Sequence, residues 1–240
     1  MVAPPSPDEE DRRQICRERR VLVTERVAHA NRIKGLLFAQ GITDYEPGRR
    51  DRRARLDTLN TADGRPLPPY LRQRISRELD RLEMIIEQIK AVETQRDALV
   101  TPQADPRAIP AILQQLRGVG PEFAAVLWSE GLFRKFDNRR QLASYAGLAP
   151  TPWQSGTVAR EQGISKAGNA KIRTTMIQLS WLWLRHQPNS TLTRWFHERT
   201  KAANGRSKRV VIVALARKLL VSLWKFATTG LVPEGAVLHG

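Results

Sequence analysis

Residues 70–100 carry apolar side chains at alternating spacings of four and three, with arginine and glutamate between them. The apolar positions of this repeat are Ile75, Leu79, Leu82, Ile86 and Ile89. A helix with this pattern buries one narrow stripe, called here the heptad seam, against a second long helix. The need for such a partner constrains the fold of this chain more than any other segment does.

The partner helix can belong to the same chain or to a second copy of it. Residues 9–40 are also predicted to be a helix, ended by Gly41, because apolar residues recur there every three or four positions. These positions are Val23, Val27, Ala30, Ile33 and Leu37. Antiparallel pairing within one chain and self-association as a coiled-coil dimer both satisfy the heptad seam. In either case residues 12–100 are predicted to be a helical linker or coiled-coil arm, and we expect a homo-oligomer to assemble through it.

Prolines place a domain boundary near the middle of the chain. Residues 101–111 contain Pro102, Pro106 and Pro110, which cannot continue a helix. We therefore expect a disordered tail over residues 1–11, the arm over residues 12–100, a proline-rich linker over residues 101–111 and a C-terminal domain over residues 112–240. Within the arm, residues 45–69 are predicted to be a charged connector rather than a packed element, because they combine arginine runs with turn residues.

Shorter apolar segments and glycine turns characterise the C-terminal domain. Helices are predicted at residues 138–145, 171–185 and 210–228, with a basic loop over residues 201–209 before the last of them. Residues 151–162 are too short and polar to form a buried element, and long period-two alternation is hard to find. The predicted fold class is therefore mainly α, with an extended helical or coiled-coil arm followed by a compact helical domain.

The charge balance points to a polyanionic partner. The 240 residues contain 40 Lys and Arg against 24 Asp and Glu, which gives a formal net charge of +16 and a pI near 11.0. Nucleic acid, DNA or RNA, is the expected partner, and an acidic protein or a membrane surface is the alternative. The single cysteine, Cys16, excludes an intrachain disulfide and a thiolate metal site. Because no signal peptide and no apolar run of about 18 residues is present, we expect a cytoplasmic, nucleoid-associated protein.

A glycine turn between two short apolar segments resembles a helix-hairpin-helix motif. Residues 112–116 are followed by Gly118-Val119-Gly120-Pro121 and then by residues 122–129. In that motif the backbone N–H groups of the turn and of the next helix grip a DNA phosphate without reading sequence. Gly118 and Gly120 are therefore candidate phosphate-binding residues. The alternative is a purely structural tight turn.

The segment from Gln154 to Asn169 is the candidate chemical centre. It sets Ser155 and Ser165 among glycines and cations just before a helix that is predicted to begin near Ala170. A helix N-terminus of this kind suits a phosphate group. The further candidate DNA- or phosphate-binding residues are Arg139, Arg140, Gly156, Arg160, Lys166, Asn169, Lys171 and Arg173. For each serine the alternative is a structural role in a turn or as a helix cap.

Several segments resemble, in order and spacing, the C-terminal transposase domain of the IS110/IS116/IS902 insertion-sequence family. They are residues 116–121, Phe136 with residues 141–150, residues 154–156 and residues 163–173. The resemblance covers roughly residues 112–186. Upstream, residues 17–40 are similar to the helical linker that precedes this domain in the family.

The resemblance implies a DNA transposase that acts by site-specific recombination with a structured guide RNA. In the family an N-terminal RuvC-like domain holds an acidic quartet for divalent metal, and the C-terminal domain supplies a serine that attacks DNA. Ser155 matches the position of that nucleophile, and Ser165 is the second choice. No carboxylate cluster of this sequence matches the quartet, so we expect no metal to bind this chain and Mg²⁺ only together with a RuvC-like domain. On this view the chain is a truncated member of the family or one half of a split enzyme.

Two functions from different classes follow from these observations. The first is a transposase whose C-terminal domain binds DNA and carries the catalytic serine. The second is a non-catalytic DNA- or RNA-binding remnant that regulates full-length transposase by forming mixed oligomers. A covalent adduct between the protein and DNA distinguishes the first from the second.

Overall fold

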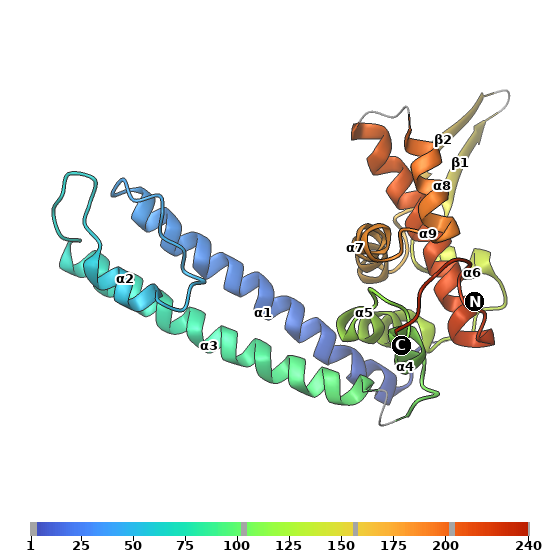
Figure 1. Cartoon of the computed structure of the whole chain (residues 1–240), viewed down its shortest axis with the longest axis horizontal. Helices are drawn as coiled ribbons and strands as arrows, with labels where there is room; N and C mark the ends of the chain where they lie inside the picture. Colours follow the sequence, from blue (N-terminus) through green and yellow to red (C-terminus); the bar gives the residue numbers. More distant parts are fainter. Residues whose placement is uncertain (1–3, 102–104, 156–157, 202–204, 240) are drawn as a thin grey trace. The chain divides into compact units, whose positions relative to one another are not determined.

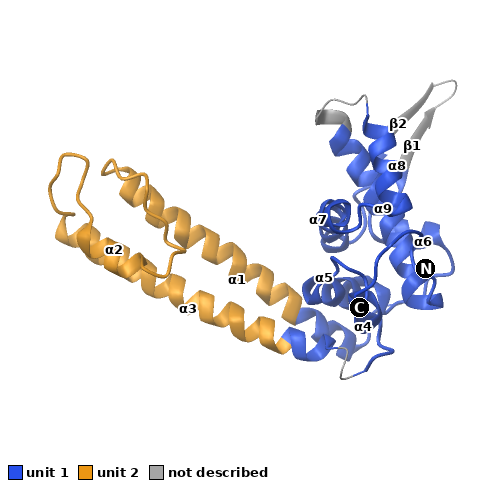
Figure 2. Ribbon diagram, in the orientation of Figure 1, with its two compact units in different colours: residues 1–14, 96–240 blue, residues 15–95 orange. Residues whose placement is uncertain are grey.

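The structure is a computed structural model that describes residues 4–101, 105–155, 158–201 and 205–239. For residues 151–155, 158–162 and 205–207 it describes the backbone alone. The chain is mainly helical, as the sequence predicts. Two compact units are distinguished, one formed by residues 1–14 with 96–240 and the other by residues 15–95 (Figure 2). We call them the C-terminal unit and the arm.

The arm is a helical hairpin made by α1 (Pro7–Phe38) from residue 15 onward and by α3 (Pro69–Val100) up to residue 95 (Figure 1). The short helix α2 (Arg52–Thr58) lies between them in the sequence. Ile33 and Leu37 of α1 share a buried cluster with Ile75, Leu79 and Leu82 of α3. Earlier in α1, Leu22 packs with the later α3 residues Ile85, Ile89 and Val92. This reversed order makes the two helices antiparallel. The heptad seam is therefore filled by the other long helix of the same chain, the first of the two predicted arrangements.

The segment between the two long helices is packed, so the prediction of an unpacked connector over residues 45–69 was wrong. Tyr45, Leu56 and Leu67 are buried in the same cluster as Ile33 and Ile75. Their spacing along the sequence follows neither a helical nor a strand period, and this is why the pattern did not reveal their burial.

The arginines of the arm are largely paired with carboxylates. Arg53 Nη2 lies 2.7 Å from Glu83 Oε2, and Arg52 Nε lies 2.8 Å from Glu83 Oε1. The hydrogen bond from Arg53 lowers the pKa of Glu83 below its usual value. The mostly buried Glu78 accepts hydrogen bonds from Arg32 Nη1 at 2.9 Å and pairs with His29 at 2.6 Å. The positive charge of the arm is thus largely balanced within the arm itself.

The start of α1 also differs from the prediction. The helix begins at Pro7, inside the segment 1–11 that was expected to be a disordered tail. Ser6 Oγ accepts a hydrogen bond from Glu9 N at 3.2 Å, and Ser6 N donates to Glu9 Oε2 at 2.7 Å. This reciprocal pair is a capping box, which satisfies two backbone N–H groups at a helix start. The proline-rich, acidic composition concealed it.

The C-terminal unit consists of short helices around three longer ones. The short elements are α4 (Ile109–Gln114), α5 (Pro121–Leu127), the π-helix η1 (Trp128–Leu132) and α6 (Arg139–Tyr145). The longer helices are α7 (Ala170–His186), α8 (Thr191–Thr200) and α9 (Gly205–Thr229). Their main core includes the fully buried Leu127, Met176, Trp183 and Leu219. None of the helices in the described ranges is both long and apolar enough to cross a membrane.

Two parts of this unit differ from the sequence-based prediction. The strands β1 (Pro150–Ser155) and β2 (Val158–Ile164) form an antiparallel hairpin where the sequence predicted only a segment too short and polar to form a buried element (Figure 1). Pro150 and Pro152 weaken the strand signal in the sequence, since proline cannot donate to a strand ladder. In addition, α9 begins at Gly205, so residues 205–209 of the predicted basic loop are helical. Lysine and arginine are good helix formers but carry no apolar periodicity.

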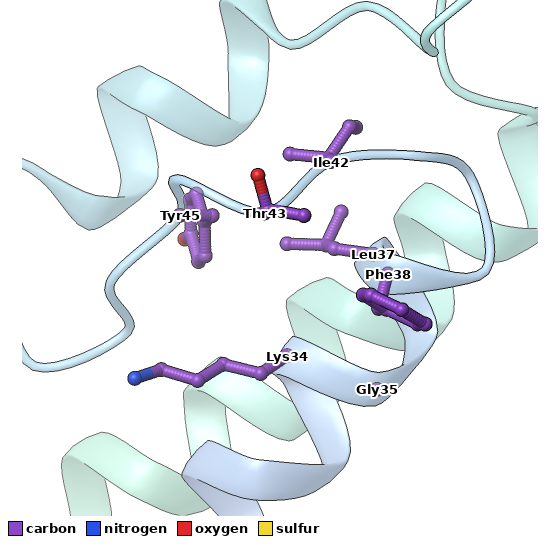
Figure 3. Close-up of a pocket in the computed structure, with 7 residues that line it drawn as sticks. All are labelled: Lys34, Gly35, Leu37, Phe38, Ile42, Thr43 and Tyr45. Carbon is purple, nitrogen blue, oxygen red and sulfur yellow. The ribbon is translucent and has the colours of Figure 1, made fainter.

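A pocket of about 450 Å³ lies in the arm, where α1 ends and the chain turns back (Figure 3). It is lined by Lys34, Gly35, Leu37, Phe38, Ile42, Thr43 and Tyr45. The Tyr45 hydroxyl donates a hydrogen bond to the Arg52 carbonyl at 2.7 Å. Burial raises the pKa of Tyr45 to about 12, and the nearby Arg52, Arg55 and Arg53 oppose this shift.

Replacing Tyr45 with phenylalanine should make the protein less sensitive to alkaline pH. Because the folded-state pKa of Tyr45 is about 12 and the ordinary value is 10.0, the stability from the neutral phenol is complete below pH 10 and is lost as the pH rises through 12. Urea unfolding should show Tyr45→Phe about 1 kcal/mol less stable at neutral pH, because the hydrogen bond to Arg52 is lost. Between neutral pH and about pH 11, its free energy of unfolding should fall less than that of the wild type.

Tyr70→Phe is the matched control, since Tyr70 is 84% exposed. Its free energy of unfolding should follow the wild-type pH dependence. If the free energy of unfolding of Tyr45→Phe fell at alkaline pH as much as that of the wild type, the raised pKa of Tyr45 would not be the cause of the fall.

Candidate nucleic-acid interface

The loop before α7 is fastened to the end of α6 by backbone hydrogen bonds. Ser165 N donates to the Ala149 carbonyl at 2.9 Å, and Asn169 N donates to the Tyr145 carbonyl at 2.6 Å. Lys166 N donates to the Gly147 carbonyl at 3.3 Å. The loop is therefore docked on the end of α6 through its backbone, and its predicted phosphate-binding role stays a prediction.

Two glycines make this close docking possible. Gly147 has φ +65°, a conformation that favours glycine. A Cβ atom on Gly168 would lie 2.6 Å from the Ser144 carbonyl oxygen and would also overlap backbone atoms of Gly147 and Tyr145. Any side chain at Gly168 would push the loop away from α6, so this position is fixed by packing.

Asn169 is the N-cap of α7. Its side-chain oxygen accepts hydrogen bonds from Lys171 N at 2.9 Å and Ile172 N at 3.2 Å. Its amide Nδ2 donates to Glu130 Oε2 at 3.0 Å. The predicted helix start near Ala170 is confirmed, and the cap is Asn169 rather than Ser165. Both polar atoms of this side chain thus have partners inside the protein.

Glu130 is the centre of a buried polar cluster that the sequence analysis missed. It belongs to η1 and is 1% exposed. Lys171 Nζ lies 3.2 Å from Glu130 Oε1, and Arg13 Nε lies 3.9 Å from Glu130 Oε2. Arg13 Nε also donates to the Ser129 carbonyl at 3.0 Å, and the Tyr145 hydroxyl donates to the Glu130 carbonyl at 2.8 Å. One sequence signal was available, because Glu130 is a lone acid in an apolar stretch.

The remaining cations of the loop face different surroundings. Lys166 is exposed and has φ 55°, which is uncommon for a residue other than glycine. Its carbonyl accepts a hydrogen bond from Arg173 Nη1 at 3.0 Å. The half-buried Arg173 therefore holds the loop, while the side chain of Lys166 is left in solvent.

The two candidate serines lie at opposite ends of the β-hairpin. Ser155 is the last residue of β1 and pairs with Val158, next to the turn. Ser165 directly follows β2, whose last residue, Ile164, pairs with Pro150. The Ser155–Val158 pair lies five residues along the strand from the Pro150–Ile164 pair, which corresponds to about 16 Å. The serines are thus alternatives and not partners in one site.

Several predicted residues around Ser155 can be placed by backbone alone. Arg160 pairs with Trp153 across the hairpin, and its side chain, like that of Ser155, is not among those described. Gly156 lies outside the described residues. No group of three or more His, Cys, Asp or Glu side chains that could hold a metal ion occurs in the described part of the chain.

The turn between α4 and α5 is constrained by packing. Gly118 has φ +92°, and a Cβ atom there would lie 2.7 Å from the Cβ of His186 in α7. Gly120 is the N-cap of α5, and no side chain caps that helix start. Gly118 therefore has a structural reason to be glycine, and the predicted phosphate-gripping role of the turn stays a prediction.

Arg139 and Arg140 begin α6, whose N-cap is Asn138. The Asn138 side chain accepts hydrogen bonds from Arg140 N at 3.0 Å and Gln141 N at 3.1 Å. Both arginine side chains are exposed and line a groove together with residues of α8 and α9. Of the predicted phosphate-binding residues, these two share one surface.

Comparison with known proteins identifies the family. Residues 111–195, which include the α4–α5 turn, the hairpin and the loop before α7, match the family described as Transposase IS116/IS110/IS902. The chain belongs to this family. It is 61% identical, over 99% of its length, to a protein of Sinorhizobium fredii (strain NGR234) that is named as a transposase.

More distant relatives carry the same kind of name. A Pseudomonas aeruginosa protein named as a family 20 transposase is 32% identical over 87% of this chain and 60% of its own length. The transposase for insertion sequence element IS1328 of Yersinia enterocolitica is 27% identical over 97% of this chain and 67% of its own. The chain spans 62% of the length of the Sinorhizobium relative and 60% of the Pseudomonas one.

Replacing Asn169 with aspartate should destabilise the C-terminal unit although aspartate is a good helix cap. The new carboxylate would replace the amide that donates to Glu130 Oε2 at 3.0 Å, so two like charges would meet in a buried place. We expect Asn169→Asp to lower the free energy of unfolding by about 2 kcal/mol or more. Adding Glu130→Gln should recover part of this loss, and urea unfolding at neutral pH measures both.

Asn138→Asp is the matched control, because Asn138 caps α6 in the same way but is exposed. It should change stability by less than about 0.5 kcal/mol. If Asn169→Asp were as harmless as Asn138→Asp, the amide at position 169 would not bond to a buried carboxylate.

Proposed function

We propose that this chain acts in the transposition of an insertion sequence, binding DNA and cleaving it with the Ser155 hydroxyl. The observation that carries the proposal is the family match over residues 111–195, which include Ser155. The 61% identity to a transposase-named relative over 99% of this chain supports it. The net charge of +16 suits a DNA substrate.

In the proposed reaction Ser155 Oγ attacks a phosphorus atom of the DNA backbone. The hydroxyl proton passes to water, the new Ser155 O–P bond forms, and the bond from phosphorus to one flanking deoxyribose oxygen breaks. That oxygen takes up a proton from water and becomes a free hydroxyl end. Cations and N–H groups near the phosphate would stabilise its developing charge. Arg160, which pairs with Trp153 two residues from Ser155, is the candidate for this role, whereas Lys166 at the hairpin base would serve the alternative nucleophile Ser165.

The position of Ser155 supports its assignment ahead of Ser165. Ser155 is the last residue of β1, at the end of the strands away from the docked loop. The backbone N–H of Ser165, in contrast, is bonded to Ala149 in the docked loop. Ser165 is the alternative nucleophile.

The partners in this reaction are also part of the proposal. We expect a structured guide RNA to select the DNA targets, a homo-oligomer to assemble through the arm, and the protein to associate with the nucleoid. Mg²⁺ would be bound by a RuvC-like domain rather than by the residues described here. Recombination cuts and rejoins two DNA sites. A homo-oligomer would supply one nucleophile from each protomer for these steps.

Ser155→Ala should abolish a covalent protein–DNA adduct. The purified chain would be incubated with Mg²⁺, guide RNA and DNA of the element end that carries a sulfur in place of a bridging oxygen at the cleavage site. Such a leaving group departs without a proton donor, so it traps the phosphoserine. Denaturing gel electrophoresis with labelled DNA should show the adduct for the wild type and none for Ser155→Ala.

Ser165→Ala is the matched control and should keep the adduct. Loss of the adduct in Ser165→Ala, with retention in Ser155→Ala, would move the nucleophile to Ser165. DNA binding by the wild type with no adduct in either protein would replace the proposal by a non-catalytic nucleic-acid-binding role.

A further inference from the structure

A groove of about 600 Å³ crosses the C-terminal unit between the start of α6, α8 and one face of α9. Five cations line it, and we call it the basic groove: Arg139, Arg140, Arg217, Lys218 and Lys225. No carboxylate is among its lining residues. Leu192, Ala214 and Val221 supply apolar lining, and Ser222 adds a hydroxyl. A surface of this composition can meet anionic groups and apolar sugar faces together.

The charge of the basic groove is not balanced inside the protein. Of the five cations none forms an ion pair with any carboxylate in the described part of the chain. The arginines of the arm behave differently, since Arg53, for example, reaches both Asp80 and Glu83. Five unpaired cations on one surface repel each other, and an external polyanion relieves that repulsion.

The α9 residues of the groove form one continuous row. They recur at helical spacings of three and four, so they lie on one face of the helix. In order they are Ala214, Arg217 with Lys218, Val221 with Ser222, and Lys225. From residue 214 to residue 225 the helix rises about 16 Å. One strand of a DNA duplex presents a phosphate about every 3.4 Å along its axis, so this length faces about four or five phosphates. The three cations of this row, with Arg139 and Arg140 contributed to the groove by α6, therefore match the number of these phosphates.

An aromatic ring holds one of these cations in position. The ammonium group of Lys218 lies 4.9 Å from the centre of the Trp195 ring in α8, and Arg199 lies 6.0 Å from the same ring. Cation–π attraction restricts the Lys218 side chain without neutralising its charge. Lys218 can therefore contact a phosphate at a smaller loss of side-chain entropy than a free lysine.

We propose that the basic groove binds the sugar–phosphate backbone of one DNA strand. This inference rests on the proposed action on DNA and adds the surface that would hold it. Arg139, Arg140 and Arg217 can donate paired N–H groups to phosphate oxygens, whereas the lysines act as point charges. Contacts of this kind fix the position of DNA without reading its sequence. The groove would therefore hold element ends and unrelated DNA with similar affinity.

The test compares two triple variants that remove the same charge. The groove variant is Arg217→Gln with Lys218→Gln and Lys225→Gln. The control variant is Arg107→Gln with Lys135→Gln and Arg185→Gln, which are exposed cations of the same unit outside the groove. Binding of the full chain to labelled duplex DNA is measured by fluorescence anisotropy from about 50 to 400 mM salt.

The groove variant should bind on the order of 100-fold more weakly at about 100 mM salt. Its log K against log salt slope should be shallower by about 2 to 3, since each phosphate contact contributes about 0.9. The control variant should lose far less affinity and keep its slope. A charge-preserving variant, Arg217→Lys with Lys218→Arg and Lys225→Arg, should keep the wild-type salt slope, because the number of positive charges in the groove is unchanged.

Each contrary outcome has a distinct meaning. A wild-type chain that binds no DNA at any salt concentration overturns the proposed function and the groove together. Wild-type binding that the groove variant retains with an unchanged slope, or equal losses in the groove and control variants, overturns the groove alone. If polyglutamate displaces the labelled DNA as well as unlabelled DNA does, the partner is an acidic protein. If the wild-type chain binds duplex RNA tenfold more tightly than duplex DNA, the assignment to DNA is likewise overturned.

Discussion

The C-terminal unit depends on one buried carboxylate. Glu130 is 1% exposed, and its partners Arg13, Asn169 and Lys171 come from α1, the loop before α7 and the first turn of α7. A carboxylate inside a protein is costly unless it is hydrogen-bonded and paired, and removing one partner of a buried pair typically costs about 3–5 kcal/mol. Because Arg13, Glu130 and the start of α7 are far apart in sequence, this one side chain joins three distant segments of the chain.

This arrangement also fixes the base of the β-hairpin. Asn169 is bonded to Glu130 through its side chain and to the Tyr145 carbonyl through its backbone, and Ser165 is bonded to Ala149, one residue before β1. Both ends of the hairpin are thus tied to α6 and α7. Ser155 is about 16 Å away at the other end of the strands, by the rise of an extended chain. In the proposed reaction this fixed base would leave Ser155, at the far end of the strands, to reach a DNA backbone.

The sequence predicted those parts of the fold that a period or a local signal specifies. The spacing from Ile75 to Ile89 predicted a long helix that needs a helical partner but left open whether that partner is in the same chain or a second copy. The loop ending at Asn169 marked the start of α7. The Glu130 cluster could not be found in this way, because Arg13, Glu130 and the Asn169–Lys171 segment share no local pattern and meet only in the folded chain. The hairpin was missed for a different reason: prolines interrupt the strand signal that backbone pairing nevertheless satisfies.

Net charge alone does not locate a nucleic-acid interface, and the two units of this chain explain why. In the arm, arginines such as Arg53 form ion pairs with carboxylates of the same unit. The electrostatic field of these arginines is therefore largely cancelled at a distance by the paired carboxylates. In the C-terminal unit, Lys171 is likewise paired with Glu130. The cations of the basic groove have no such partners among the described residues, so their field extends into solvent. The quantity relevant to the proposed DNA binding is thus the unpaired charge gathered on one surface, and in the basic groove Arg139, Arg140, Arg217, Lys218 and Lys225 supply it.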